Sequence, residues 1–309
     1  MNTNERFLRT VSAFLSLCSI RLSDDVASAL KTLAENETDE TAKTMYRCIT
    51  DDLALADRLH RPICQDTGML QFFLDVGTGF PFLNEIETVL TEAVRLATKE
   101  TPLRPNAVSP IGETNTGDNT GFGAPYIETH LVPDNSDLRI RLYLSGGGCS
   151  LPGRSKVLMP LEGVKGIKQF VYETVTAWGV NACPPLNVGI GIGADAAVAA
   201  KLSKQALLRE VGSRNPDPEL AALEETIRQD LDALGIAPLG FGGSKTVLGV
   251  NIEAAARHPA TLGVGLSFGC WATRHGEIIL HPDLSYELVS HKNTSLPGAD
   301  AEQTGRQTQ

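Results

Sequence analysis

Residues 186–208, LNVGIGIGADAAVAAKLSKQALL, predict a strand, a glycine turn and a helix in direct succession. The closely spaced glycines allow tight backbone positions where the strand passes into the helix. A strand that leads directly into a helix is typical of proteins that mix helices with sheet. We therefore expect an α/β fold.

The rest of the chain supports this class. Residues 5–60 predict helices, with Ser23 and Asp39 as candidate N-caps. Further strands are expected at 69–77, 138–145, 261–270 and 276–282, and further helices at 83–101, 166–180 and 217–234. We predict a mixed α/β (α+β) fold, with one large domain over residues 1–290 whose section 1–60 is mainly helical. The composition of residues 291–309 predicts a disordered tail.

Charge and hydropathy exclude several classes of partner. The 309 residues carry a net charge of −10 and have no run rich in Lys or Arg, which excludes nucleic acid and anionic membranes as partners. Near the N-terminus the apolar residues recur at helical spacing, which favours an amphipathic helix over a signal peptide. These are Phe7, Val11, Phe14, Leu15 and Cys18. No apolar run approaches the roughly 20 residues that span a bilayer, so we expect a cytoplasmic protein.

Three of the six cysteines occupy similar places. Cys64 opens a polar turn, Cys183 stands before two prolines, and Cys270 ends a strand. Each lies at the boundary of an element, where a side chain can point into a shared cavity, whereas Cys18 and Cys48 lie inside helical patterns and are interpreted as structural. Paired Cys-x-x-Cys zinc motifs are absent. Three separated thiolates suit an iron–sulfur cluster with one iron that lacks a protein ligand and can act as a Lewis acid.

Two glycine stretches offer a competing interpretation. GIGADA, residues 191–196, fits a dinucleotide-binding turn, although Glu210 is the only acidic residue near the expected ribose position. GFGGSKT, residues 240–246, resembles a phosphate loop but has Ser244 before its lysine. Close backbone packing explains both stretches adequately. A dinucleotide-binding oxidoreductase built on Gly191 and Gly193, or a noncatalytic binding module with buried cysteines, therefore remains an alternative.

Five motifs resemble one family. They are PICQDTG (62–68), NTGDNTG (115–121), GGGC (146–149), NACPP (181–185) and GCW (269–271). Their order and spacing are similar to those of the class I iron–sulfur fumarase and L(+)-tartrate dehydratase family, over about residues 10–290. The resemblance implies a [4Fe–4S] hydro-lyase in which Cys64, Cys183 and Cys270 bind the cluster, with glycine-rich loops gathered around it.

The same resemblance implies roles for other residues. Gln65, Asp66 and Arg104 match substrate-contacting positions, and Gly146, Gly147 and Gly148 let backbone N–H groups approach a carboxylate. His258, assisted by Asp66, is expected to protonate the departing hydroxyl. The roles of Cys149, Arg154 and Lys156 stay open.

The glycine loop GGGCSLPGRSK resembles the alpha-subunit branch that acts on L(+)-tartrate, whereas fumarases of this class have GGGSEN. Single-chain members continue into a second domain, so the resemblance implies a separate beta subunit and, by analogy, an α2β2 assembly. A two-subunit fumarase acting on fumarate and malate is the alternative within the same chemistry.

Overall fold

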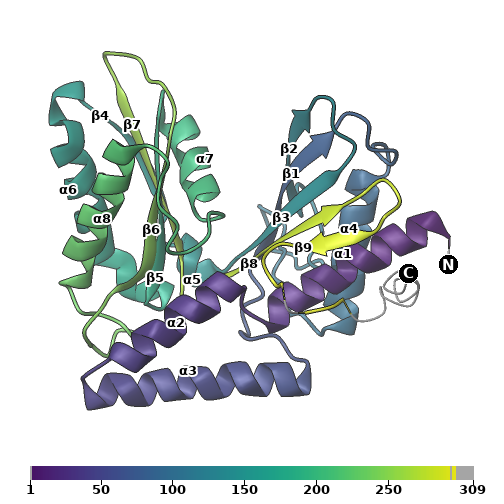
Figure 1. Cartoon of the computed structure of the whole chain (residues 1–309), viewed down its shortest axis with the longest axis horizontal. Coiled ribbons are helices and arrows are strands. Elements are labelled where there is room, and N and C mark those ends of the chain that lie inside the picture. The colour runs from purple at the N-terminus through teal and green to yellow at the C-terminus, as the bar shows by residue number, and fades with distance from the viewer. Residues whose placement is uncertain (1, 293, 297–309) are drawn as a thin grey trace, which may run out of the picture. The chain divides into compact units, whose positions relative to one another are not determined.

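The computed structural model describes residues 2–292 and 294–296 (Figure 1). The predicted mixed α/β class is confirmed. Within the predicted tail, residues 293 and 297–309 lie outside the described residues.

The longer helices are α1 (Thr3–Ile20), α2 (Asp24–Asn36), α3 (Glu40–Leu59), α4 (Ile86–Glu100), α6 (Gly163–Trp178), α7 (Ala196–Ala206) and α8 (Pro218–Asp232), and the short ones are α5 (Gly147–Ser150), η1 (Pro160–Glu162) and η2 (Gly179–Ala182). The strands are β1 (Met69–Gly77), β2 (Tyr126–Val132), β3 (Leu138–Ser145), β4 (Arg154–Leu158), β5 (Leu186–Gly193), β6 (Val247–Ala254), β7 (Leu262–Gly269), β8 (Arg274–Leu280) and β9 (Tyr286–Leu288).

The chain forms two compact units. Unit 1 comprises Met1–Asp24, Asp52–Ser145 and Arg274–Gln309, and unit 2 comprises Asp25–Asp51 and Gly146–Thr273. The chain therefore crosses from one unit to the other several times, and the predicted motifs are divided between them. Each unit has its own sheet and its own apolar core.

Unit 1 contains a five-stranded sheet in the order β2-β1-β3-β8-β9, in which only β1 and β2 run parallel. Helix α1 packs against α4 and β8. Its five predicted apolar residues are all fully buried, as expected for an amphipathic helix. Gly276 of β8 lies so close to α1 that an added Cβ would stand 2.3 Å from Cys18 Sγ. Burial raises the pKa of the Cys18 thiol, which fits its predicted structural role, whereas Cys48 is exposed on α3.

One end of this sheet gathers three segments that carry polar residues. Met69 at the start of β1 pairs with Ser145 at the end of β3, and Leu144 pairs with Arg274 at the start of β8. Because β1 and β8 both run antiparallel to β3, their first residues meet the last residues of β3. The loop that contains Cys64 enters the sheet at this end.

Unit 2 is a three-layer arrangement around a four-stranded sheet in the order β4-β7-β5-β6. Helix α7 covers one face, and α6 and α8 cover the other (Figure 1). A Cβ added at Gly191 of β5 would lie 1.9 Å from the Ala199 carbonyl oxygen, and one at Gly265 of β7 would lie 2.3 Å from the same atom. The backbone of α7 therefore rests directly on the two central strands, which only glycine permits.

This packing accounts for the dinucleotide-like motif. Gly191 and Gly193 lie against α7, and the Asp195 carboxylate accepts a hydrogen bond of 2.9 Å from Val198 N at the first turn of that helix. A carboxylate at the helix N-terminus occupies the place where a dinucleotide fold binds pyrophosphate, and it would repel that anion. The structure thus favours the packing interpretation of GIGADA.

The phosphate-loop interpretation of residues 240–246 also fails. The Glu37 carboxylate accepts hydrogen bonds from Ser244 N at 3.0 Å and Ser244 Oγ at 3.2 Å, and Lys245 forms an ion pair with Asp232. The stretch leads into β6 rather than into a helix. A phosphate loop needs an open anion site followed by a helix N-terminus.

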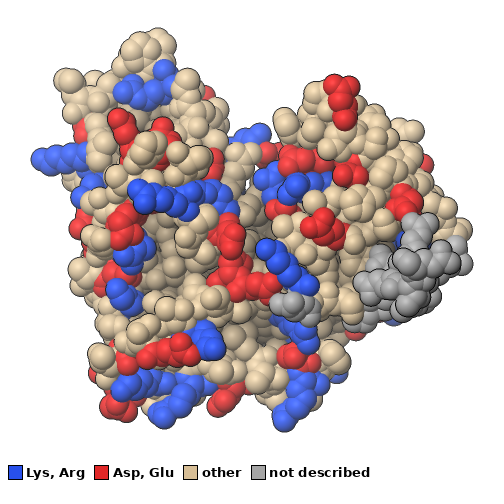
Figure 2. All heavy atoms as spheres, in the orientation of Figure 1, with Lys and Arg blue, Asp and Glu red and all other residues tan. Residues whose placement is uncertain are grey.

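The surface and the helices bear on possible partners. Figure 2 shows Lys and Arg side chains interspersed with Asp and Glu on the visible face, a distribution unlike the basic patch of a nucleic-acid-binding protein. Across residues 2–292 and 294–296, none of the helices has both the length and the apolar character needed to cross a bilayer.

Gly191→Ala should destabilise unit 2 strongly. The added methyl group meets the Ala199 carbonyl oxygen and the Ser203 nitrogen, and backbone atoms cannot yield as flexible side chains do. We expect a loss of at least about 3 kcal/mol of unfolding free energy, measured by denaturant titration.

Gly249→Ala, on the neighbouring strand β6, is the matched control because its Cβ would approach no atom more closely than 3.3 Å, the distance to the Val211 side chain. Equal stability of the two variants would show that α7 does not pack on β5 as described.

Candidate active site

The Cys64 loop is ordered by its own polar residues. Cys64 Sγ lies 3.6 Å from Gln65 Oε1 and donates to it, and the Asp66 carboxylate accepts from Gly68 N at 2.9 Å. Gly68 adopts a φ of +78°, which favours glycine at this turn. The loop thus presents a partly exposed thiol just before β1 enters the sheet.

Asp66 connects this loop to the long polar loop of unit 1. Asn106 Nδ2 donates to Asp66 Oδ1 at 2.7 Å. Asn119, buried in the NTGDNTG motif, accepts from Asn106 N at 2.6 Å and donates to the Arg104 carbonyl at 3.3 Å. The structure therefore brings the segments of Gln65, Asp66 and Arg104 together, with Arg104 exposed. The sequence did not predict Asn106 or Asn119 as site residues. Asn119 does lie in NTGDNTG, one of the five motifs that carry the family resemblance.

Sequence reasoning also missed Arg274. This residue begins β8 and its Nη2 donates to the Asp66 carbonyl oxygen at 2.7 Å. The available signal was its place four residues after Cys270, in GCWATR.

In unit 2 the glycine loop and two of the cysteines occupy adjoining turns. Gly146 precedes the single turn of α5, and an added Cβ at Gly148 would lie 2.8 Å from the Asn181 carbonyl oxygen. Asn181 belongs to η2, the turn that ends at Cys183. The glycines thus allow the loop to approach the Cys183 turn at backbone distance.

Cys183 and Cys270 are joined through the backbone. The Cys183 carbonyl accepts a hydrogen bond of 3.1 Å from Trp271 N, and the Cys270 carbonyl accepts from Thr273 N at 3.0 Å and Thr273 Oγ1 at 2.7 Å. Cys183 itself has a φ of +52°, an uncommon conformation for a residue other than glycine. Such conformations concentrate at functional sites when the surroundings enforce them.

The three predicted cluster ligands are divided between the units. Cys64 belongs to unit 1, and Cys183 and Cys270 belong to unit 2. Among the described residues, neither unit by itself gathers three His, Cys, Asp or Glu side chains in an arrangement that could hold a metal ion. Each of the three cysteines is partly or fully exposed at a turn, whereas Cys18 is buried. An exposed position is the environment that a reactive or metal-binding cysteine requires.

Lys204 lies near Cys149, the residue that follows the three glycines. Burial lowers the pKa of the Lys204 ammonium, and the neighbouring Cys149 sulfur acts in the opposite direction. Arg154 lies 4.9 Å from the centre of the Trp178 ring, and Lys156 lies 5.0 Å from that of Phe170. Arg154 and Lys156, whose roles the sequence left open, therefore lie over aromatic rings.

His258 lies in the connection between β6 and β7. Its Nδ1 accepts a hydrogen bond of 3.1 Å from Ala260 N, so Nε2 carries the proton of the neutral ring. Strand β7 separates this connection from Cys270, and its eight residues extend over roughly 20 Å or more. Unit 2 thus does not bring His258 to Cys270, and its role as the acid stays a prediction.

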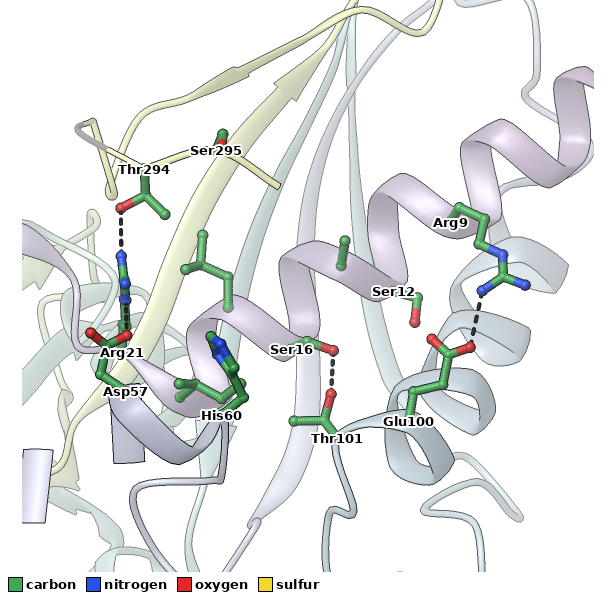
Figure 3. Close-up of a pocket in the computed structure, with 13 residues that line it drawn as sticks. Arg9, Ser12, Ser16, Arg21, Asp57, His60, Glu100, Thr101, Thr294 and Ser295 are labelled. Carbon is green, nitrogen blue, oxygen red and sulfur yellow. Dashed lines mark hydrogen bonds and ion pairs between the residues drawn. The ribbon is translucent and has the colours of Figure 1, made fainter. Parts of the chain in front are cut away.

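A separate hollow of about 690 Å³ runs along α1 in unit 1 (Figure 3). None of the predicted site residues lines it. Its two arginines are already neutralised, Arg9 by Glu100 at 3.0 Å and Arg21 by Asp57. A dicarboxylate would have to displace these carboxylates, so the hollow is a poor candidate for an anionic substrate.

Comparison with known proteins decides the family. The model of the family described as Fumarate hydratase (Fumerase) matches residues 8–279. The chain belongs to this family. Its members are hydro-lyases, so the predicted class of reaction is confirmed.

Bacterial and archaeal relatives match most of the chain. The L(+)-tartrate dehydratase subunit alpha of Escherichia coli strain K12 is 48% identical over 286 residues, covering 93% of this chain and 94% of its own. The protein of that name in Shigella sonnei gives the same values. A protein of Methanocaldococcus jannaschii, provisionally given the same subunit name, is 38% identical over 259 residues, covering 83% of this chain and 91% of its own. The resemblance inferred from the five motifs is confirmed.

Proposed function

We propose that this chain is the alpha subunit of a [4Fe–4S]-dependent hydro-lyase that dehydrates L(+)-tartrate to oxaloacetate. The observation that carries the proposal is the hydrogen bond from Trp271 N to the Cys183 carbonyl, because it holds two cysteine turns beside the glycine loop. The subunit name of the bacterial relatives supports the choice of substrate. The cysteine that follows the three glycines, Cys149, supports it as well.

Cys64, Cys183 and Cys270 would hold the cluster. When bound, a cluster with three thiolate ligands supplies one iron as a Lewis acid toward hydroxyl and carboxylate oxygens. The exposure of the three thiols at turns suits this task. The αL conformation of Cys183 fixes the direction of its side chain.

The remaining residues would bind and orient the substrate. Tartrate carries two carboxylates, and Arg104 offers a guanidinium that can bind one of them through two N–H groups. The loop of Gly146, Gly147 and Gly148 would bring backbone N–H groups to a carboxylate oxygen. Gln65 lies beside Cys64 and can donate to a substrate hydroxyl, while Cys149 borders the position of the second hydroxyl.

Dehydration removes a proton from one carbon and hydroxide from the next, and the enol so formed rearranges to oxaloacetate. We propose that a base on a beta subunit takes the proton and that His258, whose Nε2 carries a proton, protonates the hydroxide. Since β7 separates His258 from Cys270, this histidine would act in the site of a second alpha chain. That requirement is consistent with the proposed α2β2 assembly, which we place in the cytoplasm because its reducing conditions protect thiolates.

A mixing experiment tests this assignment. His258→Asn should lower kcat at least about 100-fold in the assembled enzyme, the range of a lost general acid. Coassembly of His258→Asn chains with Cys64→Ser chains should restore part of the activity, because each mixed pair keeps one complete site.

If His258→Asn kept activity within a few-fold of wild type, His258 would not be the acid. Loss of activity without recovery on mixing would place it in the site of its own chain.

The cluster itself is tested by chemical analysis. Wild-type chain purified without oxygen should contain about four iron atoms and four acid-labile sulfides. Cys64→Ser, Cys183→Ser and Cys270→Ser should each lose most of both, because three thiolates are the proposed ligand set. Cys48→Ser, exposed on α3, is the control and should keep them. Absence of iron after anaerobic reconstitution with the beta subunit would contradict the proposal.

Substrate choice is tested by steady-state kinetics on the assembled enzyme. We expect a higher kcat/KM for L(+)-tartrate than for malate or fumarate, and little activity for the alpha chain alone. The reverse preference would assign the chain to a two-subunit fumarate hydratase, the alternative that the description of the family supports.

A further inference from the structure

Arg274 is a buried cation at the end of the unit 1 sheet. Only 3% of its surface is exposed, and it begins β8 opposite Leu144 of β3. Its Nη2 donates to the carbonyl oxygen of Asp66, two residues after Cys64. The guanidinium therefore lies at the loop that carries the proposed substrate contacts.

Arg274 lacks partners for several of its donors within the part of the chain that the structure describes. A guanidinium has five N–H donors. Nε and Nη1 of Arg274 are buried and have no hydrogen-bond partner among residues 2–292 and 294–296, and its Nη2 contacts a carbonyl oxygen rather than a carboxylate. A buried charge is costly unless it is paired and hydrogen-bonded. Arg274 thus has the donors and the charge to bind an anion.

Other arginines of unit 1 differ in this respect. Arg139 and Arg141, on the adjacent strand β3, contact the carboxylates of Glu277 and Asp75. The arginines along the hollow of Figure 3 are likewise paired. Arg274 differs from these arginines because the acceptor that its Nη2 contacts is a backbone carbonyl oxygen, not a carboxylate.

A second polar group without a partner belongs to the residue after Asp66. Thr67 is fully buried, and its Oγ1 has no hydrogen-bond partner among the described residues. Asp66 is thus next to Thr67 in the chain and hydrogen-bonded to Arg274, and both of these residues have polar atoms without a partner. Buried polar groups are normally hydrogen-bonded, so we interpret these atoms as contacts for a ligand with several acceptor oxygens.

We propose that Arg274 binds one carboxylate of the dicarboxylate substrate, with the Thr67 hydroxyl as a second donor. This inference rests on the proposed function and extends it, since Arg104 accounts for one of the two substrate carboxylates and Arg274 for the other. A carboxylate satisfies both requirements of the guanidinium at once, because it supplies a full negative charge and up to four lone pairs.

Kinetics of the assembled holoenzyme test the inference. Arg274→Gln should raise KM for L(+)-tartrate about 100-fold, as expected when one partner of a buried charge pair is lost, with the iron content of wild type. Arg274→Lys keeps the positive charge but loses the paired N–H donors of the guanidinium, so its affinity for L(+)-tartrate should lie between those of Arg274→Gln and wild type. Arg139→Gln, on the same sheet, should leave KM unchanged.

Thermal unfolding separates binding from a structural role. Succinate, a dicarboxylate without a hydroxyl to eliminate, should raise the Tm of wild type but not of Arg274→Gln. Without succinate the variant should be as stable as wild type, because it removes a buried charge whose Nε and Nη1 lack hydrogen-bond partners among the described residues.

An unchanged KM in Arg274→Gln and Arg274→Lys, a lower Tm without ligand, or a loss of iron with normal KM would each overturn the inference. If the wild-type enzyme turned over no dicarboxylate, the proposed function itself would fail instead.

Discussion

The hydrogen bond between Trp271 N and the Cys183 carbonyl is the contact on which the unit 2 part of the candidate site depends. It joins two turns that are 87 residues apart in the chain (270 − 183), and the glycine loop reaches the same place because Gly148 approaches Asn181 at backbone distance. The sheet of unit 2 makes this possible, since β5 and β7 pair antiparallel and Asn187 is opposite Gly269. The start of one strand and the end of the other therefore present their cysteines together.

Much of the fold follows from the sequence, because strong periodicity and short turns determine it locally. Phe7, Phe14 and Cys18 predict the buried face of α1, which the structure confirms. The glycines of β5 were ambiguous, since tight helix packing and nucleotide binding require the same residue. Only the position of Ala199 against Gly191 distinguishes the two. The division into two units depends on long-range contacts that no local pattern records.

The sequence predicts the candidate site only in part. Cys64, Cys183 and Cys270 could be selected because each stands at the end of an element, and Asp66 because it belongs to a recognisable motif. Arg274 could not be selected, because a cation near a strand is usually exposed or paired, and its burial is visible only in the structure. The separation of His258 from Cys270 by the length of β7 likewise requires the strand register. Sequence patterns thus predict which residues could form the site, but not which of their neighbours are buried or paired.

The central proposal is that Cys64, Cys183 and Cys270 hold one cluster with an iron open to substrate. Mössbauer spectroscopy of the assembled enzyme, reconstituted without oxygen with ⁵⁷Fe and recorded with and without L(+)-tartrate, tests it most directly. The account predicts one iron subsite distinct from the other three, whose isomer shift rises when tartrate is added while the rest stay unchanged. A spectrum of equivalent irons that tartrate does not alter, or no cluster signal, would contradict it.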